Sequence, residues 1–152
     1  MRILLTGASG AIGAALAPEL AARGHEVRGF ARDPARVSAA GIADVVRGDV
    51  VSGAGLSEAL AGAEVAYYLI HCMEPAGDAA VALLDRERGA AARFRDAARE
   101  AGVRRVVYLG GLVPGDRPPS PHLASRLAAE ELLLDAAPQV VALRASIVLS
   151  AT

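Results

Sequence analysis

The sequence contains no lysine, asparagine or tryptophan, so all 16 of its basic residues are arginines. The missing lysine excludes phosphate-loop nucleotide hydrolysis and Schiff-base catalysis, because both need a lysine amine. Cys72 is the only cysteine, which excludes an intramolecular disulfide. The three histidines form no Cys/His cluster, and we therefore expect no metal site.

Long hydrophobic runs and a strong charge of one sign are also missing. The chain begins MRILLTGASG, whose apolar run ends at glycine and is too short for a signal peptide or a membrane span. The formal net charge is -1, which gives no general attraction for nucleic acid or for an anionic membrane. We therefore expect a cytoplasmic protein that binds neither of them.

The length and composition predict a single domain over residues 1–152, because 53% hydrophobic and 22% charged residues suffice to form a buried core. Short β-branched runs alternate with longer Ala/Leu-rich stretches, as in a parallel sheet covered by helices. Right-handed crossovers then predict an α/β fold, a doubly wound parallel sheet of strand order 3-2-1-4-5-6, with no substrate domain after it. The expected strands are 2–6, 26–31, 44–48, 64–70, 104–110 and 139–145, and the expected helices are 11–23, 34–40, 54–61, 78–101 and 121–136.

Three glycines follow the first strand and open the first helix. Gly7 permits a tight turn, Gly10 lets the backbone approach a pyrophosphate, and Gly13 lets the helix pack against the strand. The free amides at the helix start favour an anion, and Ser9 adds a hydroxyl donor. The pattern predicts a dinucleotide site, although three glycines can also do no more than shape a turn.

The end of the second strand bears on the choice of dinucleotide. Arg32 stands where a cation can meet a 2′-phosphate, and Arg36 can add a second charge, so NADP is favoured over NAD. Asp33 precedes Pro34 as a helix cap would. The alternatives are a solvated turn with exposed arginines, or an Asp33 that binds the ribose of NAD.

These motifs resemble the atypical short-chain dehydrogenase/reductases, a group that includes NmrA-like proteins and NAD(P)-dependent epimerase-like proteins. The likeness covers the whole chain: TGASGAIG, FARDP, GDV, YYLIH, AGVRRVVYLGGL, HLASRLAAEELL and LRASIVLS. It implies a Rossmann fold and a set of cofactor contacts. These are the loop residues Gly7, Ser9, Gly10, Ala11, Ile12 and Gly13, then Asp49 and Val50 at the adenine, Leu69, Ile70 and His71 at the pyrophosphate and ribose, and Gly110, Gly111, Leu112, Ser146 and Ile147 near the nicotinamide. Asp49 is otherwise read as a turn or cap residue.

The sequence departs from the family where catalysis is expected. Active members use a Tyr and a Lys four residues apart on a helix and a Ser at the end of the fifth strand. Here His122, Arg126 and Gly110 or Gly111 stand at those places. At a spacing of four the two residues share one helix face, where Arg126 can donate to the cofactor ribose or phosphate and His122 can serve as an acid or base. In the alternative reading, Ser120 caps a helix whose His122 and Arg126 lie on a solvated face.

Three functions remain open. The first is the NAD(P)-binding domain of an oxidoreductase or an epimerase/dehydratase-like protein with an unidentified small-molecule substrate. The second is a non-catalytic, NmrA-like redox sensor that binds the dinucleotide, and the third is a truncated, inactive fragment. In relatives the helix at 78–101 can form a dimer contact, so a homodimer is a further expectation. A redox role for Cys72 is the weakest candidate.

Overall fold

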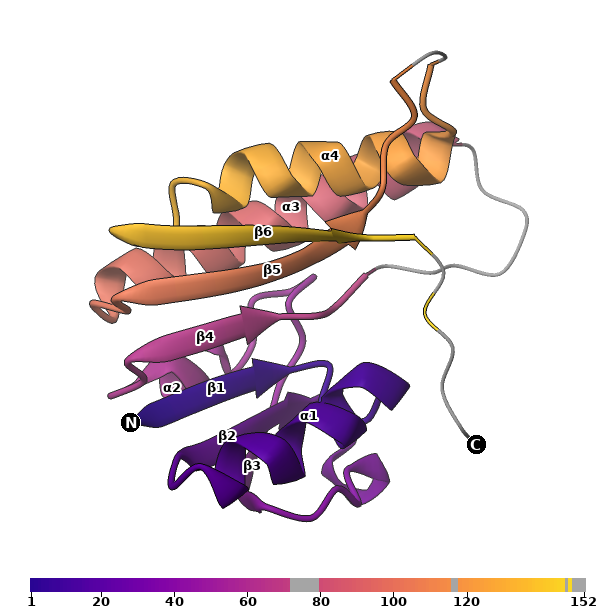
Figure 1. Cartoon of the computed structure of the whole chain (residues 1–152). Coiled ribbons are helices and arrows are strands. Elements are labelled where there is room, and N and C mark those ends of the chain that lie inside the picture. The colour runs from indigo at the N-terminus through magenta and orange to yellow at the C-terminus, as the bar shows by residue number, and fades with distance from the viewer. Residues whose placement is uncertain (72–79, 116–117, 147, 149–152) are drawn as a thin grey trace.

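The computed structural model describes residues 1–71, 80–115, 118–146 and 148. Its centre is one six-stranded sheet of order β3-β2-β1-β4-β5-β6, in which every pairing is parallel. The fold class and the strand order predicted from the sequence are therefore confirmed (Figure 1). The strands are β1 (Arg2–Thr6), β2 (Glu26–Ala31), β3 (Ile42–Arg47), β4 (Val65–Tyr68), β5 (Arg105–Gly111) and β6 (Gln139–Ala145), and the helices are α1 (Ala11–Ala22), α2 (Leu56–Leu60), α3 (Ala80–Glu100) and α4 (Pro121–Leu133), with a 3₁₀ turn η1 (Pro34–Arg36).

Two hydrophobic cores lie on opposite faces of the sheet. Successive side chains of a strand point to opposite faces, so Leu4 belongs to one core while its neighbours Ile3 and Leu5 belong to the other. The larger core packs β1 to β5 against α2, α3 and α4, with Phe94 and Tyr68 in edge-to-face contact at 4.9 Å. The smaller core packs β1 and β2 against α1. Figure 1 shows α1 on one side of the sheet and α3 and α4 on the other.

The prediction of a second helix over 34–40 is wrong. Asp33 does cap a turn, because its Oδ1 accepts the amide of Ala35 at 3.1 Å, but the helical geometry ends at Arg36. After it, Val37 and Ala39 pack alternately on the core beneath α1, as extended chain does. That burial outweighs the local signal for a helix. The other helices are confirmed, and α4 stops at Leu133 rather than at 136.

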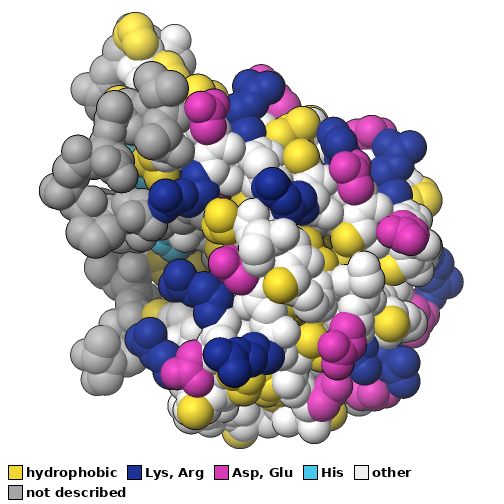
Figure 2. Space-filling view, turned by 180° about the vertical axis from the view of Figure 1, so that it is seen from behind, with side chains coloured by type: hydrophobic (Ala, Val, Ile, Leu, Met, Phe, Trp, Pro, Cys, Tyr) yellow, Lys and Arg dark blue, Asp and Glu magenta, His cyan; other side chains and the backbone are white. Residues whose placement is uncertain are grey.

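The surface of the described residues mixes charges of both signs. Figure 2 shows arginine and acidic side chains interspersed on the face seen from behind Figure 1. Within the described ranges, no helix combines the length and the apolar character that crossing a membrane requires. Apolar side chains are exposed on edge strand β6, where Val141 is 44% and Leu143 is 52% accessible.

Candidate functional site

The candidate site lies where the strand order reverses, at the carboxyl ends of β1 and β4. Thr6 is buried there and joins the two strands, since its hydroxyl donates to the carbonyl of Tyr67 at 2.9 Å and accepts the amide of Leu69 at 3.1 Å. In open α/β sheets such a switch point leaves a crevice between the loops that leave the two strands. Thr6 therefore fixes the two walls of the crevice relative to each other.

The glycine loop, residues 7–13, forms one wall of that crevice, and side chains at Gly7 and Gly13 would collide with neighbouring atoms. Gly7 has a φ of 71°, in the left-handed region, and an added Cβ would lie 3.3 Å from Leu69. A Cβ on Gly13 would lie 2.4 Å from the carbonyl oxygen of Gly7. Gly10 caps α1 without a side-chain hydrogen bond, so no cap side chain occupies the amides of the first turn, which Ala11 and Ile12 begin and which can serve as anion donors.

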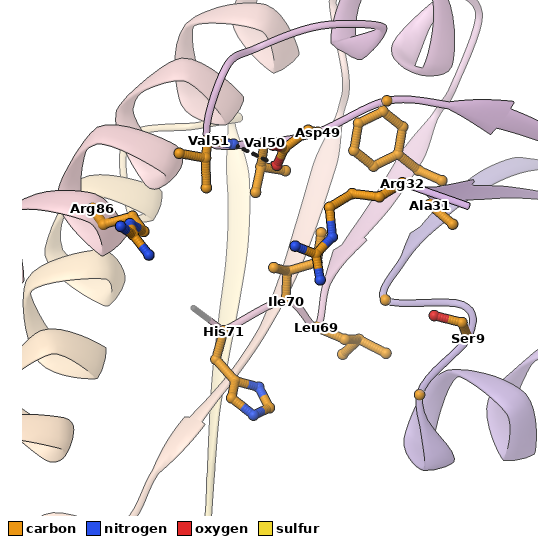
Figure 3. A pocket seen from close by; sticks show the side chains of 14 residues that line it. Ser9, Ala31, Arg32, Asp49, Val50, Val51, Leu69, Ile70, His71 and Arg86 are labelled. Carbon is orange, nitrogen blue, oxygen red and sulfur yellow. Dashed lines mark hydrogen bonds between the residues drawn. The ribbon is translucent and has the colours of Figure 1, made fainter. Parts of the chain in front are cut away.

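The crevice is a cavity of about 590 Å³, a size that suits a large cofactor. Figure 3 shows Ser9 on the glycine loop at one side, Arg86 of α3 at the other, and Arg32 pointing in between them. Of the residues expected to bind cofactor, Ala11, Ile12, Gly13, Arg36, Gly110, Gly111 and Arg126 do not line it. Those that do are Gly7, Ser9, Gly10, Arg32, Asp49, Val50, Leu69, Ile70 and His71.

The turn after β2 separates Arg32 from Asp33. The Arg32 side chain is exposed and lines the cavity, whereas Asp33 is not among the lining residues. Its carboxylate instead accepts the Ala35 amide as the cap of η1. Arg36 lies at the end of η1, exposed and away from the cavity wall.

The loop after β3 forms the far end of the cavity. Asp49 accepts the amide of Val51 at 3.0 Å through Oδ1, a local turn that holds the loop (Figure 3). Val50 is buried and lines the cavity next to Phe30. Gly48 is required there, because a Cβ on it would lie 2.3 Å from the Phe30 ring. This end of the cavity thus combines the apolar Val50 and Phe30 with the Asp49 carboxylate.

Five lining residues were missed by reasoning from the sequence. Arg86 is the most consequential, because it brings a second cation to the cavity from α3. No local sequence pattern distinguishes Arg86 from the other charged residues of that helix, so its place at the cavity could not be predicted. The remaining four, Phe30, Ala31, Gly48 and Val51, adjoin predicted residues and follow from the same strand-end rule.

Arg126 and His122 lie near one another on the first turns of α4. Ser120 caps that helix by accepting the Leu123 amide at 3.3 Å, and Pro121 starts it, as expected. His122 is exposed, but Arg126 is only 8% accessible. The solvated face of the alternative reading thus holds for His122 and not for Arg126.

The buried Arg126 guanidinium is bonded to backbone. Nη1 donates to the carbonyl of Ile70 at 3.2 Å and Nη2 donates to the carbonyl of Leu109, while Cζ lies 5.1 Å from the centroid of the Tyr108 ring. The Tyr108 hydroxyl in turn donates to the Arg126 carbonyl at 2.9 Å. Arg126 therefore clamps the carboxyl ends of β4 and β5 to α4.

A second histidine, His71, lies close to His122. The ring of His71, just past β4, lies with its centroid 6.3 Å from that of His122 at an interplanar angle of 78°. Partial burial lowers the pKa of His71, and the positive charges of Arg126 and of His122 lower it further. The neutral imidazole is therefore the favoured form of His71 at neutral pH.

The remaining expected contacts lie at the ends of β5 and β6 or outside the described residues. Gly110 and Gly111 end β5, and a Cβ on Gly111 would lie 2.6 Å from Leu123 at the start of α4. Ser146 follows β6 and is exposed. The expectations for Cys72 and Ile147 fall outside the described residues. Among the described residues, no group of three or more His, Cys, Asp or Glu side chains could hold a metal ion.

Tyr108 yields a prediction for stability at high pH. Burial raises the pKa of Tyr108 to about 12, well above the value of an unfolded chain. The folded state thus binds this proton more tightly, so its contribution is complete below about pH 10 and is lost as the pH rises towards 12. We expect a decrease in unfolding free energy on the order of 2 kcal/mol across that window. Urea unfolding at several pH values measures it, and in Tyr108→Phe this part of the decrease should be absent; an equally steep decrease in that variant would contradict the assignment.

The comparisons with known proteins agree with this geometry. A family described as NAD(P)H-binding matches residues 7–148. A 3-beta-hydroxysteroid dehydrogenase of Mycolicibacterium neoaurum is 34% identical over 113 residues, which is 70% of this chain and 31% of that protein. A 3 beta-hydroxysteroid dehydrogenase/Delta 5-->4-isomerase of Mycobacterium tuberculosis H37Rv is 33% identical over 113 residues, 70% of this chain and 30% of that protein. The chain spans about a third of the length of these curated relatives.

Solved structures share the fold over nearly the whole chain. A short-chain dehydrogenase/reductase superfamily protein of Agrobacterium tumefaciens with bound NAD has a TM-score of 0.77 and 28% identity, covering 95% of this chain and 48% of that one. MoeE5 in complex with UDP-glucose and NAD has a TM-score of 0.75 and 29% identity, covering 95% of this chain and 54% of that one. The expected resemblance to the short-chain dehydrogenase/reductase and epimerase-like proteins is thereby confirmed.

Proposed function

The chain belongs to the NAD(P)H-binding family, and we propose that it is the cofactor-binding domain of an oxidoreductase that uses NADP(H). The observation that carries the proposal is the cavity at the switch point, with the glycine loop and the α1 amides at one wall and Asp49 and Val50 at the end. A pyrophosphate fits the wall that the glycine loop and the α1 amides form, and an adenine fits the end that holds Asp49 and Val50. The dehydrogenases among its relatives support redox chemistry on a small molecule as the purpose of the bound cofactor.

NADP is favoured over NAD by the turn after β2. Asp33, the carboxylate that NAD would need for its ribose hydroxyls, is occupied as the cap of η1 and lies off the cavity wall. Arg32 lines the cavity, and Arg86 faces it from α3. A 2′-phosphate would give the exposed Arg32 guanidinium a charge-assisted contact that NAD cannot offer. The solved relatives that hold NAD differ from the proposal in this respect.

We expect Arg32→Gln to weaken NADPH binding by about 10- to 100-fold, the value of one charge-assisted contact to phosphate, and to leave NADH binding unchanged. Calorimetric titration with both cofactors measures the two affinities. Arg36→Gln is the matched control, since Arg36 is four residues further and does not line the cavity. Equal losses for NADPH and NADH would contradict a 2′-phosphate contact. Failure of both cofactors to bind the unaltered protein at millimolar concentration would reject the dinucleotide site itself.

A non-catalytic sensor is the second candidate. It is favoured by Arg126, whose guanidinium is bonded to two backbone carbonyls instead of facing the cavity. Both candidates predict NADPH binding, and only the oxidoreductase predicts NADPH oxidation in the presence of a carbonyl substrate. An assay over a panel of ketones and aldehydes therefore separates them.

A further inference from the structure

Arg86 reaches the cavity from α3, the helix that connects β4 to β5. Because these two strands are parallel, α3 runs back along the sheet, from the edge where the strands end to the edge where they begin (Figure 1). Arg93 lies two turns further along α3, and its Cδ would lie 3.3 Å from a Cβ added at Gly53, in the loop after β3. That contact shows which face of α3 lies against the loop.

Arg86 is on the same face of α3 as Arg93, because residues seven apart lie nearly one above the other on a helix. At a rise of about 1.5 Å per residue, Arg86 is about 10 Å nearer than Arg93 to the edge where the strands end. It therefore stands beyond the part of the loop that Arg93 contacts, and it lines the cavity together with Val50 and Val51 of that loop. Figure 3 shows Arg86 and Arg32 on different sides of the cavity.

The base is the part of a dinucleotide that belongs at this end of the cavity. The pyrophosphate is expected at the glycine loop, on the other wall, and the 2′-phosphate of NADP at the exposed Arg32. Val50 and Phe30 give the end an apolar lining. A guanidinium packs well on an aromatic ring, because both are flat and the ring attracts a cation to its face.

Stacking on a ring does not compete with hydrogen bonds of the same guanidinium. Arg86 is half-buried and has other interactions within the chain. The N–H groups of a guanidinium point outwards in its plane, whereas a stacked ring lies above that plane. Bonds along the edge of the Arg86 guanidinium therefore orient its flat face and leave that face able to contact a base.

We propose that the Arg86 guanidinium stacks on the adenine ring of the bound nucleotide, from the side of α3. Arg86 is then a specificity-determining residue for the base, whereas Arg32 acts on the 2′-phosphate. The proposal rests on the proposed function and uses only its nucleotide-binding part, so it holds for the oxidoreductase and for the non-catalytic sensor alike.

The first test uses ADP as the probe, since ADP carries adenine and a pyrophosphate but neither 2′-phosphate nor nicotinamide. Arg86→Gln and Arg86→Lys should each weaken ADP binding by about tenfold in calorimetric titration, because neither side chain offers the flat cation. Arg88→Gln is the matched control, since Arg88 is exposed on the same helix and does not line the cavity. Unchanged affinity in both Arg86 variants would overturn the proposal, and full affinity in Arg86→Lys alone would overturn stacking in favour of charge.

Failure of the proposed function would look different. An unaltered protein that binds neither ADP nor NADPH would reject the nucleotide site itself, and the stacking contact with it. An unaltered protein that binds ADP, together with Arg86 variants that bind it equally well, would reject the stacking contact alone.

The two dinucleotides separate a contact with the base from a contact with the 2′-phosphate. Arg86→Gln should weaken NADPH and NADH binding by the same factor, since both carry adenine, whereas Arg32→Gln should act on NADPH only. A loss confined to NADPH in Arg86→Gln would overturn the adenine contact and place Arg86 at the 2′-phosphate.

NMR spectra of the unaltered protein with saturating ADP show the contact directly. Nuclear Overhauser effects are expected between H2 or H8 of the adenine and the Hδ protons of Arg86, and none to those of Arg88. Their absence at Arg86 would overturn the proposal even if the Arg86 variants bind ADP more weakly.

Discussion

Gly13→Ala is expected to weaken NADPH binding by about 100-fold or more and to lower the free energy of unfolding by about 1–3 kcal/mol. The added Cβ would lie 2.4 Å from the Gly7 carbonyl oxygen and 2.9 Å from the Cα of Ala8. Both contacts are with backbone, so no side-chain rotation can relieve them. Either α1 moves away from the loop or the loop moves into the cavity.

The loss of binding should exceed what the loss of stability explains. The pyrophosphate is expected to sit on the first-turn amides of α1, which Gly10 precedes, so a displaced helix start removes several hydrogen bonds at once. Calorimetric titration with NADPH measures the affinity, and urea unfolding measures the stability. The matched control is Gly115→Ala, because none of the described residues lies within 4 Å of a Cβ there and the change should alter neither quantity. Unchanged NADPH affinity in Gly13→Ala would mean that the dinucleotide binds elsewhere.

The fold could be predicted because its signals are local and consistent. The bounds of β1, β2 and β6 are those that the β-branched runs indicate, and the handedness of the crossovers leaves one strand order. The failure at 34–40 has a tertiary cause. A capping Asp33 and Pro34 begin a 3₁₀ turn as well as they begin an α-helix, and only contact with the core beneath α1 decides that Val37 continues as extended chain.

The residues of the candidate site could be predicted only where they follow directly on the ends of strands. Gly7, Arg32 and Asp49 each follow a strand, and the rule that parallel strands end at one edge brings them together. Arg86 and Arg126 come from helix interiors. Which side of a helix faces the cavity or the sheet depends on packing, so the sequence alone gave Arg126 a cofactor contact as its expected role and no role to Arg86.

Arg126→Met is expected to lower the free energy of unfolding by about 2–4 kcal/mol, the range seen when buried charge-assisted hydrogen bonds lose their donor. The carbonyls of Ile70 and Leu109 lose the guanidinium that bridges them, and the Tyr108 ring loses the cation stacked on it. Relief from burying a charge offsets part of this loss. Methionine has a similar length and avoids a large cavity, so the measured change reports mainly the lost hydrogen bonds.

Arg126→Lys should recover less than half of that stability, because one ammonium group cannot match the planar fork that reaches two carbonyls at once. The control for loss of an arginine is Arg99→Met on α3, where the ion pair with Asp135 has side chains 56% and 71% exposed and contributes at most about 1 kcal/mol. Urea unfolding followed by circular dichroism compares the variants. Equal free energies of unfolding for Arg126→Met and Arg99→Met would show that the Arg126 bridge between β4, β5 and α4 contributes little to stability.

Arg126→Met should also change the surroundings of His71 at the edge of the cavity, in addition to lowering the stability. Without the hydrogen bond to Ile70, the segment that carries His71 is no longer tied to the helix that carries His122, so the pKa of His71 should rise towards the ordinary histidine value as the nearby cation is removed. NADPH affinity should fall by only a few-fold, since Arg126 does not line the cavity. An NADPH affinity that falls 100-fold while the pKa of His71 stays fixed would instead give Arg126 a direct contact with the cofactor.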